Sequence, residues 1–494
     1  MREVIRLKPL RPTAPAPPVD LQKARALRYV RGLIWTYFIL LMFEGTLRKW
    51  ILPQYSDVLL IVRDPVVLAI YCLAIRARVF PKNVWMLSLG IIALLSWLIS
   101  LVVLQPYLSL KPLILVTGFG FRSNYLHLPL IFVIGKVFDH DDLLKLGRWV
   151  LLGSLPMALL LAVQFNAAPD SFINRTAGSG DTLQIASSGD KIRPPGTFSF
   201  VSGVVFSAAL ATSFLLYGGL TRGVYRNWLI FAAGFALMIA IGVSGSRSVL
   251  LAVLLVVATL VMIVLVYPAA LNQFGRNLLI AVVALFLVSR VPIFKQGVEI
   301  LSDRFTSTAE AEETTIAGGL ITRGLSGFKE GILFIPLAPI GGYGLGIGTN
   351  GGAKFLTGRS VFLLTEGEWG RVVLECGPIL GPAFLLWRTL LTFSLGLLSI
   401  RQLKQGNILT IFLYAAGFLS LLSGPFGQPT SLGFCVFLCG ICLASANKKE
   451  VDSEAEGIGP GLPARPQLAR RSRFAEQLHR SPVAPREPDD SADW

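Results

Sequence analysis

The sequence has little charge and almost no histidine. Only 15% of its 494 residues are charged while 53% are hydrophobic, and its three histidines are His127, His140 and His479. Apolar runs of about 20 residues recur along the chain, and each is long enough to cross a bilayer. The composition therefore excludes an ordinary soluble domain and predicts an all-α polytopic membrane protein.

Cysteine is also scarce, with five residues in all. Cys439 and Cys442 form a C-x-x-C pattern inside the last apolar run, with no histidine or second pair nearby. A metal or redox site needs such partners, whereas small residues in an apolar helix favour close helix packing. We interpret the pair as a packing feature, and the cysteines carry no functional prediction.

The apolar runs predict about 12 transmembrane helices. They lie at 31–47, 57–75, 84–104, 113–135, 147–166, 197–217, 227–243, 248–267, 277–294, 373–399, 407–424 and 427–445. Two connections are far longer than ordinary loops: 166–196, and a large loop at 295–370 between the ninth and tenth spans. Spans 1–9 thus occupy 31–294 and spans 10–12 occupy 371–445.

The positive charges predict the orientation. From an N-terminus in the cytoplasm, the short inner loops carry eleven basic residues: Arg76, Arg78, Lys82, Lys136, Lys145, Arg148, Arg222, Arg226, Arg276, Arg401 and Lys404. The short outer loops carry four: Arg48, Lys49, Lys111 and Arg247. The positive-inside rule places both termini in the cytoplasm and both long loops outside.

The two ends of the chain differ in charge. Residues 1–30 form a basic cytoplasmic arm whose expected partner is anionic lipid headgroups. Residues 446–494 are rich in proline, arginine and acids and nearly neutral, and we expect a disordered cytoplasmic tail. Nucleic acid is a competing partner for a net charge of +16, but this charge is scattered among membrane loops without a recognisable binding module. We expect no nucleic acid.

Two arginines stand at or near the expected outer interface. Arg193 lies in "KIRPPGTFSF", where the first long loop re-enters the membrane, and Arg247 lies in "GVSGSRSVLLA", at a tight turn between two spans. Arginine keeps its charge at any relevant pH, and its forked donors match phosphate oxygens. The pair therefore suits a lipid-linked phosphate or pyrophosphate. The alternative is that each arginine simply extends to lipid headgroups.

Acids gather where the large loop returns to the membrane. Glu366, Glu368, Arg371 and Glu375 lie within ten residues, and a helix starting near Glu368 places the last three on one face. A solvated helix start explains Glu366 and Glu368 through the helix dipole. It explains Arg371 and Glu375 poorly, because ionisable groups at membrane depth usually mark a pathway or a site.

Four short motifs occur in a defined order from about residue 190 to 381. They are Arg193 before Gly196-Thr197-Phe198, the Ser246-Arg247 pair, the glycine-rich stretch from Pro339 to Gly348, and Glu375-Cys376-Gly377 with Gly381. In this order and topology the chain resembles the O-antigen ligase and polymerase family, which are membrane glycosyltransferases. The resemblance implies a GT-C-like fold and transfer from undecaprenyl-pyrophosphate-linked sugars at the outer, periplasmic face of the bacterial inner membrane.

One position departs from the family pattern. Nine residues before Glu375, where the family usually has histidine, this chain has Glu366, and no histidine lies in an outer loop. With "FEGTLRKWILP" and "RDPVVLAIY" near the start, this variant resembles the exopolysaccharide-polymerase branch. The resemblance thus implies a polymerase of lipid-linked repeat units. A ligase that transfers the glycan to lipid A core or to protein stays open, since both break the same bond.

The resemblance also implies roles for individual residues. Arg193 and Arg247 hold the donor pyrophosphate and stabilise its developing charge. Glu366, or Glu368 if the register slips, orients or deprotonates the acceptor hydroxyl in an inverting transfer. Arg323, Glu368 and Arg371 contact the substrate or fix the carboxylates. No metal or cofactor is expected. The expected partners are a lipid-linked donor, a lipid-linked acceptor, and the flippase and chain-length regulator of such a pathway.

A secondary transporter is the alternative from another class. It shares twelve spans with both ends inside, and Arg63, Asp64 and Arg122 are candidates to line its pathway. Structural pairing of Arg63-Asp64 with the span that holds Arg122 is an equal alternative. A transporter also predicts matching interrupted helices in two halves, and the sequence shows no such repeat.

The segment "GIGTNG", from Gly346 to Gly351, matches the letters of a dinucleotide-binding turn. That turn must follow a strand and open a helix, and it needs an acidic residue about twenty positions later. Here it follows an amphipathic segment in the large outer loop. We therefore expect these glycines to supply turns with positive φ that let the loop lie close to the membrane or to a glycan.

Overall fold

The computed structural model describes residues 21–178, 192–221, 223–266, 326–359 and 361–447, which form helices and no strand. Within this part of the chain, seven helices are long and apolar enough to cross a membrane. They are α1 (Leu21–Thr46), the segment Val58–Arg76 that ends in α2 (Asp64–Arg76), α3 (Val84–Leu104), α6 (His140–Asn166), α7 (Val201–Leu220), α14 (Glu368–Lys404) and α16 (Pro429–Ala446). The predicted α-helical membrane protein is confirmed at this level.

Three further apolar helices are not among these seven: α8 (Asn227–Val243), α9 (Arg247–Val266) and α15 (Ile408–Ser423). The run expected at 113–135 is not one helix but three pieces, α4 (Leu110–Phe121), a π-helical turn at Arg122–Leu126, and α5 (Pro129–Val137). The span expected at 277–294 lies outside the described residues. The total of twelve therefore stays a prediction.

Helix α1 differs from its predicted start. The basic segment assigned to the N-terminal arm is continuous with the first span, because α1 runs without a break from Leu21. At this end of the molecule, Arg31 on α1 forms ion pairs of 3.0 and 2.9 Å with Asp139 and Asp142 at the start of α6. Arg31, the first residue after the predicted arm, thus joins α1 to α6.

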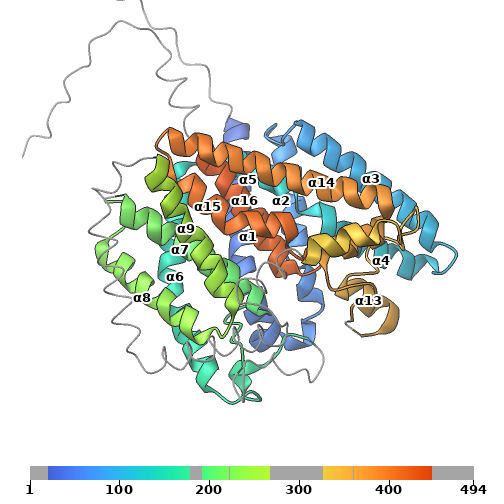
Figure 1. Ribbon diagram of the computed structural model, residues 1–494, viewed down its shortest axis with the longest axis horizontal. Helices are drawn as coiled ribbons and strands as arrows, with labels where there is room; N and C mark the ends of the chain where they lie inside the picture. The colour runs from blue at the N-terminus through green and yellow to red at the C-terminus, as the bar shows by residue number, and fades with distance from the viewer. Residues whose placement is uncertain (1–20, 179–191, 222, 267–325, 360, 448–494) are drawn as a thin grey trace, which may run out of the picture. The chain divides into compact units, whose positions relative to one another are not determined.

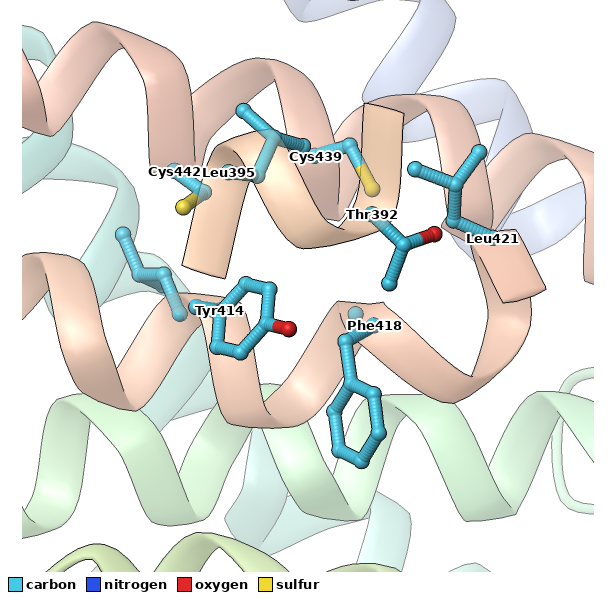
Figure 2. Close-up of a pocket in the computed structure, with 9 residues that line it drawn as sticks. Thr392, Leu395, Tyr414, Phe418, Leu421, Cys439 and Cys442 are labelled. Atoms are coloured by element: carbon cyan, nitrogen blue, oxygen red, sulfur yellow. The ribbon is translucent and has the colours of Figure 1, made fainter. Parts of the chain in front are cut away.

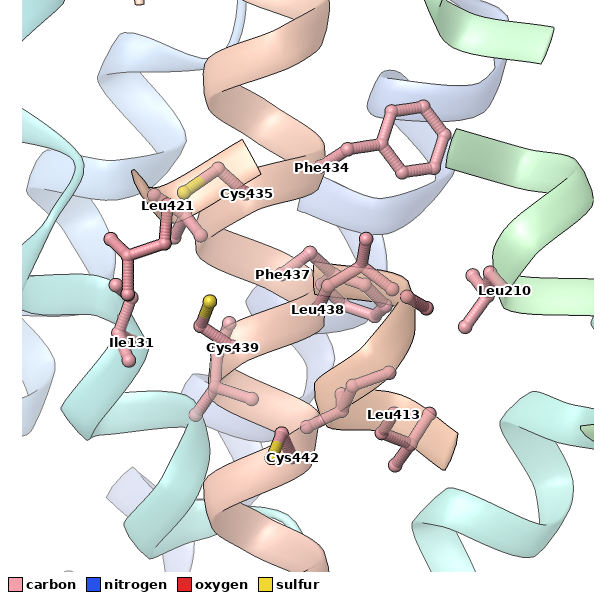
Figure 3. Packing of buried hydrophobic residues seen from close by; sticks show 14 of the residues in the cluster. Ile131, Leu210, Leu413, Leu421, Phe434, Cys435, Phe437, Leu438, Cys439 and Cys442 are labelled. Atoms are coloured by element: carbon pink, nitrogen blue, oxygen red, sulfur yellow. The ribbon is translucent and has the colours of Figure 1, made fainter. Parts of the chain in front are cut away.

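Helix α16 is the most buried of the seven, and it packs against α5, α7, α14 and α15 (Figure 1). Figure 3 shows Ile131 of α5, Leu210 of α7 and Leu413 of α15 around helix α16. Gly440 leaves no room for a side chain against Ile134 of α5. Small residues of this kind allow membrane helices to approach closely in the absence of a strong hydrophobic driving force.

Helix α14 bends sharply at Gly377, whose φ of 81° is outside the helical range, and Pro378 follows it. Proline lacks an N–H and clashes with the preceding turn, which explains a break at this position. The loop that precedes α14 in sequence packs into the bend, since Gly342 and Gly377 would each meet the opposite backbone if they carried a Cβ atom. The bend is thus a place where loop and helix backbones touch.

The glycine-rich loop uses its glycines for conformation and for close approach. Gly342, Gly344 and Gly346 have φ of 71°, 106° and 97°, a range that residues with side chains rarely adopt. A Cβ atom on Gly346 would overlap the carbonyl of Val116 on α4. The predicted positive φ is confirmed at these positions. Gly348 and Gly351, which belong to the same segment, do not have positive φ. The loop lies against helix backbones, and its closeness to the membrane or to a glycan stays a prediction.

Candidate functional site

The first element of the candidate site is the short segment between α6 and α7 that carries Arg193. The Arg193 side chain is half-buried, and its Nε is fully enclosed without a hydrogen-bond partner. In the described chain, Arg193 forms no hydrogen bond or ion pair. A guanidinium is a strong donor that is normally satisfied when buried, so this one has donors available for a ligand.

The second element is Arg247, the first residue of α9, which follows a turn at Gly245 with φ of 54°. The Arg247 side chain is half-buried. Burial lowers the pKa of Arg193, and the nearby charge of Arg247 lowers it further. Two arginines 54 positions apart in the sequence are thus brought within electrostatic range, as the phosphate-site hypothesis requires.

A cluster of buried charges lies beside this segment, at the end of α1. Arg48 donates to the carbonyl of Ser56 over 2.9 Å and to Ser199 Oγ, near the start of α7, over 3.0 Å. Its ion-pair partner is Glu44, at 3.5 Å, and Glu44 also pairs with Arg63 at 3.1 Å. These bonds join the end of α1 to the residues just before α7 and just before α2.

The same cluster continues toward the break between α4 and α5. Asp64 pairs with Arg122 and, at 3.0 Å, with His127, whose other ring nitrogen contacts the Tyr37 hydroxyl at 3.2 Å. Arg63 reaches the same hydroxyl. These bonds join the start of α2, which holds Arg63 and Asp64, to α1 and to the π-helical turn that holds Arg122, as structural pairing predicts. This placement gives no support to their use as a transport pathway.

A second buried network is built around the start of α14. Arg371 bonds to Glu368 at 2.9 Å, to Glu375 at 2.6 Å, and to Asn124 of the π-helical turn at 2.8 Å. Arg388 bonds to Glu368 at 2.9 Å. We call Glu368, Arg371, Glu375 and Arg388 the α14 network. It contains two acids and two arginines, all of them buried.

The α14 network also holds the glycine-rich loop. Glu375 Oε1 accepts from the backbone N–H of Gly348 over 2.9 Å, and the Glu375 carbonyl accepts from Gly344 over 3.1 Å. Arg388 donates to the carbonyls of Leu421 and Gly424, where α15 ends. The network therefore joins α14, α15, the π-helical turn and the loop.

This network changes the interpretation of two predicted site residues. The helix does begin at Glu368, and Glu368, Arg371 and Glu375 share a face, as expected. Arg371 was expected to contact the substrate or to fix the carboxylates, and the structure has it buried and bonded to Glu368 and Glu375. Substrate binding by Glu368 and Arg371 stays a prediction. The packing of the helices accounts for them without a substrate. Arg388 is a partner that sequence reasoning missed.

Glu366 lies outside this network. Its side chain is exposed, just before α14, and within the described residues it forms no hydrogen bond or ion pair. Glu330, on the helical segment 326–334, accepts a hydrogen bond from Thr365 and lies against Gly367. Sequence reasoning missed this second carboxylate. Arg323 lies outside the described residues.

A pocket between α14, α15 and α16 is lined by apolar groups and is too narrow to hold a water molecule (Figure 2). Cys439 and Cys442 lie in its wall among Thr392, Tyr414 and Leu421. All five cysteines are free thiols. The pocket is a packing gap, and its lining offers no group suited to a phosphate or a sugar.

The part of the chain that the structure describes holds no group of three His, Cys, Asp or Glu side chains placed to bind a metal ion. Compared with known proteins, the chain matches no family model and no curated protein. Of the predicted site residues, the structure relates Arg193 to Arg247, and Glu366 is an exposed carboxylate just before α14.

Proposed function

We propose that the protein is a membrane glycosyltransferase that polymerises oligosaccharide repeat units linked to undecaprenyl pyrophosphate. One observation carries the proposal: Arg193, half-buried and unpaired within the described chain, lies in electrostatic range of Arg247. Two guanidinium groups near one another repel, and an anion between them converts that repulsion into attraction. A pyrophosphate is the anion whose oxygens suit two forked donors.

The reaction follows from these charges. The acceptor hydroxyl oxygen attacks the anomeric carbon of the donor sugar from the side opposite the pyrophosphate, which inverts the configuration. The bond from that carbon to the pyrophosphate oxygen breaks, and its electron pair leaves with the pyrophosphate. Arg193 and Arg247 stabilise the charge that develops there, because fixed donors in a site with little water need no reorganisation.

Glu366 takes the acceptor proton in this proposal. Its carboxylate is exposed and has no protein partner in the described chain, so it is free to meet a hydroxyl group. A general base must come within hydrogen-bond reach of the proton it removes, and substrate binding is expected to bring these groups together. Glu330 is close to the same turn and is the second candidate for this role.

The remaining parts of the proposal follow the expected topology. The site faces the outer side of the bacterial inner membrane, both termini face the cytoplasm, and the chain crosses the membrane about twelve times. The donor and acceptor are both lipid-linked and approach within the membrane plane. The arginines supply the charge stabilisation that a divalent cation supplies in many soluble glycosyltransferases, so the proposal includes no metal and no cofactor.

The test replaces Arg193, Arg247 or Glu366 by glutamine in the host and separates lipid-linked from secreted glycans by gel and mass spectrometry. We expect each change to lower long-polymer output about 100-fold, with single repeat units accumulating on the lipid. Arg226→Gln, at an exposed position beside α8, is the matched control and should leave output unchanged. Normal polymer from Arg247→Gln would overturn the proposal. Accumulation of long lipid-linked chains would indicate the ligase instead.

A further inference from the structure

The segment that carries Arg193 is held by one turn. Arg193 is followed by Pro194, Pro195 and Gly196, and Gly196 has φ of 59°. Proline has no N–H and a fixed φ, so these two residues form a stiff link without backbone donors. Gly196 is therefore the first residue after Arg193 whose backbone N–H can be held by a neighbour. A shift at Gly196 is transmitted to Arg193 through the stiff link.

Both backbone groups of Gly196 have side-chain partners from other helices. Its N–H donates to Oε1 of Gln164, near the end of α6, over 2.8 Å. Its carbonyl accepts from Nζ of Lys49, just after α1, over 2.6 Å, and more weakly from Nε2 of Gln164 over 3.5 Å. The turn is thus clamped from both sides by residues 32 and 147 positions away. We call Lys49 and Gln164 the Gly196 clamp.

Lys49 is an unusual member of such a clamp. Its side chain is fully buried, at 0% exposure, and no carboxylate pairs with it in the described chain. Among the residues that the structure describes, its ammonium contacts the Gly196 carbonyl and the ring of Trp50, whose centroid is 4.4 Å away. Removing a lysine charge from water without an ion-pair partner is unfavourable. An uncharged donor could bond to the Gly196 carbonyl with a lower desolvation penalty. Helix packing alone therefore does not explain why a lysine stands at position 49.

The rest of the contact between α1 and this segment allows little adjustment. Thr197 Oγ1 donates to the carbonyl of Met42 over 2.8 Å, and Thr46 Oγ1 donates back to the carbonyl of Thr197 over 3.3 Å. A Cβ atom on Gly45 would overlap the backbone of Phe198 and its neighbours. The segment is therefore packed tightly against α1, and Lys49 bonds to its N-terminal part at Gly196.

We propose that Lys49 is a positioning residue for the anion site: through the Gly196 carbonyl it fixes where the Arg193 guanidinium stands relative to Arg247. The ammonium does not touch the phosphate and acts only through the turn. This inference rests on the proposed function, because it assumes that Arg193 binds the pyrophosphate of the donor. It deepens that function by naming the residue that sets the geometry of the binding group.

The test measures binding of inorganic pyrophosphate to the full-length protein in detergent by calorimetry. Arg193→Gln reports on the site itself, and we expect it to raise the Kd at least about tenfold. Lys49→Met keeps the length and apolar character of the side chain while removing the donor. We expect a similar rise, since a misplacement of about 1 Å is enough to lose much of an oriented interaction. Lys111→Met, at an exposed lysine, is the control.

The double variant K49M/R193Q separates positioning from general damage. If Lys49 acts through Arg193, the double variant binds pyrophosphate within about twofold of Arg193→Gln alone. An additional loss of tenfold would show that Lys49 acts elsewhere and would overturn the inference. Unchanged pyrophosphate affinity in Lys49→Met would also overturn it, even if thermal stability fell.

Gln164→Leu provides an independent approach, because it removes the other half of the Gly196 clamp without changing charge. It should raise the Kd as Lys49→Met does, and it serves as the test if Lys49→Met does not fold. The two proposals fail differently. Unchanged binding in Arg193→Gln contradicts the proposed function, whereas weakened binding in Arg193→Gln with normal binding in both clamp variants contradicts only the inference.

Discussion

Two regions of the molecule use arginine in opposite ways. In the α14 network, two arginines and two glutamates are buried and bonded to one another. At the start of α7 and α9, Arg193 and Arg247 lie near each other, and no acid of the described chain pairs with Arg193. The first arrangement is complete within the protein. The second is the one to which we assign an anion, so the comparison sets a structural use of arginine beside the proposed ligand-binding use.

The difference in partners explains how the α14 network contributes to the fold. A buried charge must be balanced nearby, and the removal of one member leaves another uncompensated. Glu375 illustrates this, because its carboxylate accepts from Arg371, Asn124 and the N–H of Gly348. Every one of these bonds stabilises the packing of helices and loop. A residue in such a position contributes to folding, whatever chemistry its neighbours perform.

The largest expected effect is on the stability of the α14 network. Arg371→Met leaves Glu368 and Glu375 buried without their shared partner, and we expect a loss of about 3–5 kcal/mol of unfolding free energy. The measurement is thermal unfolding of the purified protein in detergent. Arg359→Met, at an exposed arginine, should change little. A wild-type melting temperature for Arg371→Met would show that the network is not needed for folding.

A smaller loss is expected where the loop meets the helices. Gly346→Ala forces a side chain into a conformation with φ of 97° and against the Val116 carbonyl, which should destabilise the protein by about 1–3 kcal/mol. Gly358→Ala is a matched control, because Gly358 has φ of 73° but open space around its Cβ position. Gly358→Ala should therefore lose less unfolding free energy than Gly346→Ala. If both variants lost the same unfolding free energy in this assay, the positive φ alone would explain the effect. The close approach of Gly346 to the Val116 carbonyl would then contribute nothing to stability.

The smallest effect on stability is expected at the candidate site. Arg193→Gln removes a charge that has no partner in the described chain and lies near a like charge, so the unfolding free energy should stay within about 0.5 kcal/mol of wild type. This variant should nevertheless lose polymer output. A large loss of stability would show that Arg193 is part of the fold, like Arg371, and would remove the distinction between the two regions.

Much of the helical layout could be predicted from the sequence, because apolar length is a local property. The run at 84–104 matches α3 in both bounds, and the start of α14 at Glu368 was expected. The broken helix at 113–135 was missed, since its Arg122, Asn124 and His127 sit in an apolar stretch whose average hides them. Pairing of Asp64 with the span that holds Arg122 was one of two alternatives, whereas the bond between Asn124 and Arg371 joins residues far apart in the sequence and was not anticipated.

The sequence by itself determined that this is a helical membrane protein, that arginines gather near two helix starts, and that the glycines at 342–346 need positive φ. Only the tertiary structure decided which charges neutralise one another. It enclosed Glu368 and Arg371 in a balanced network, brought Arg193 near Arg247, and clamped the turn at Gly196 with Lys49. The physical reason is distance. Hydropathy and backbone preference act within a few residues, whereas charge balance depends on which helices become neighbours.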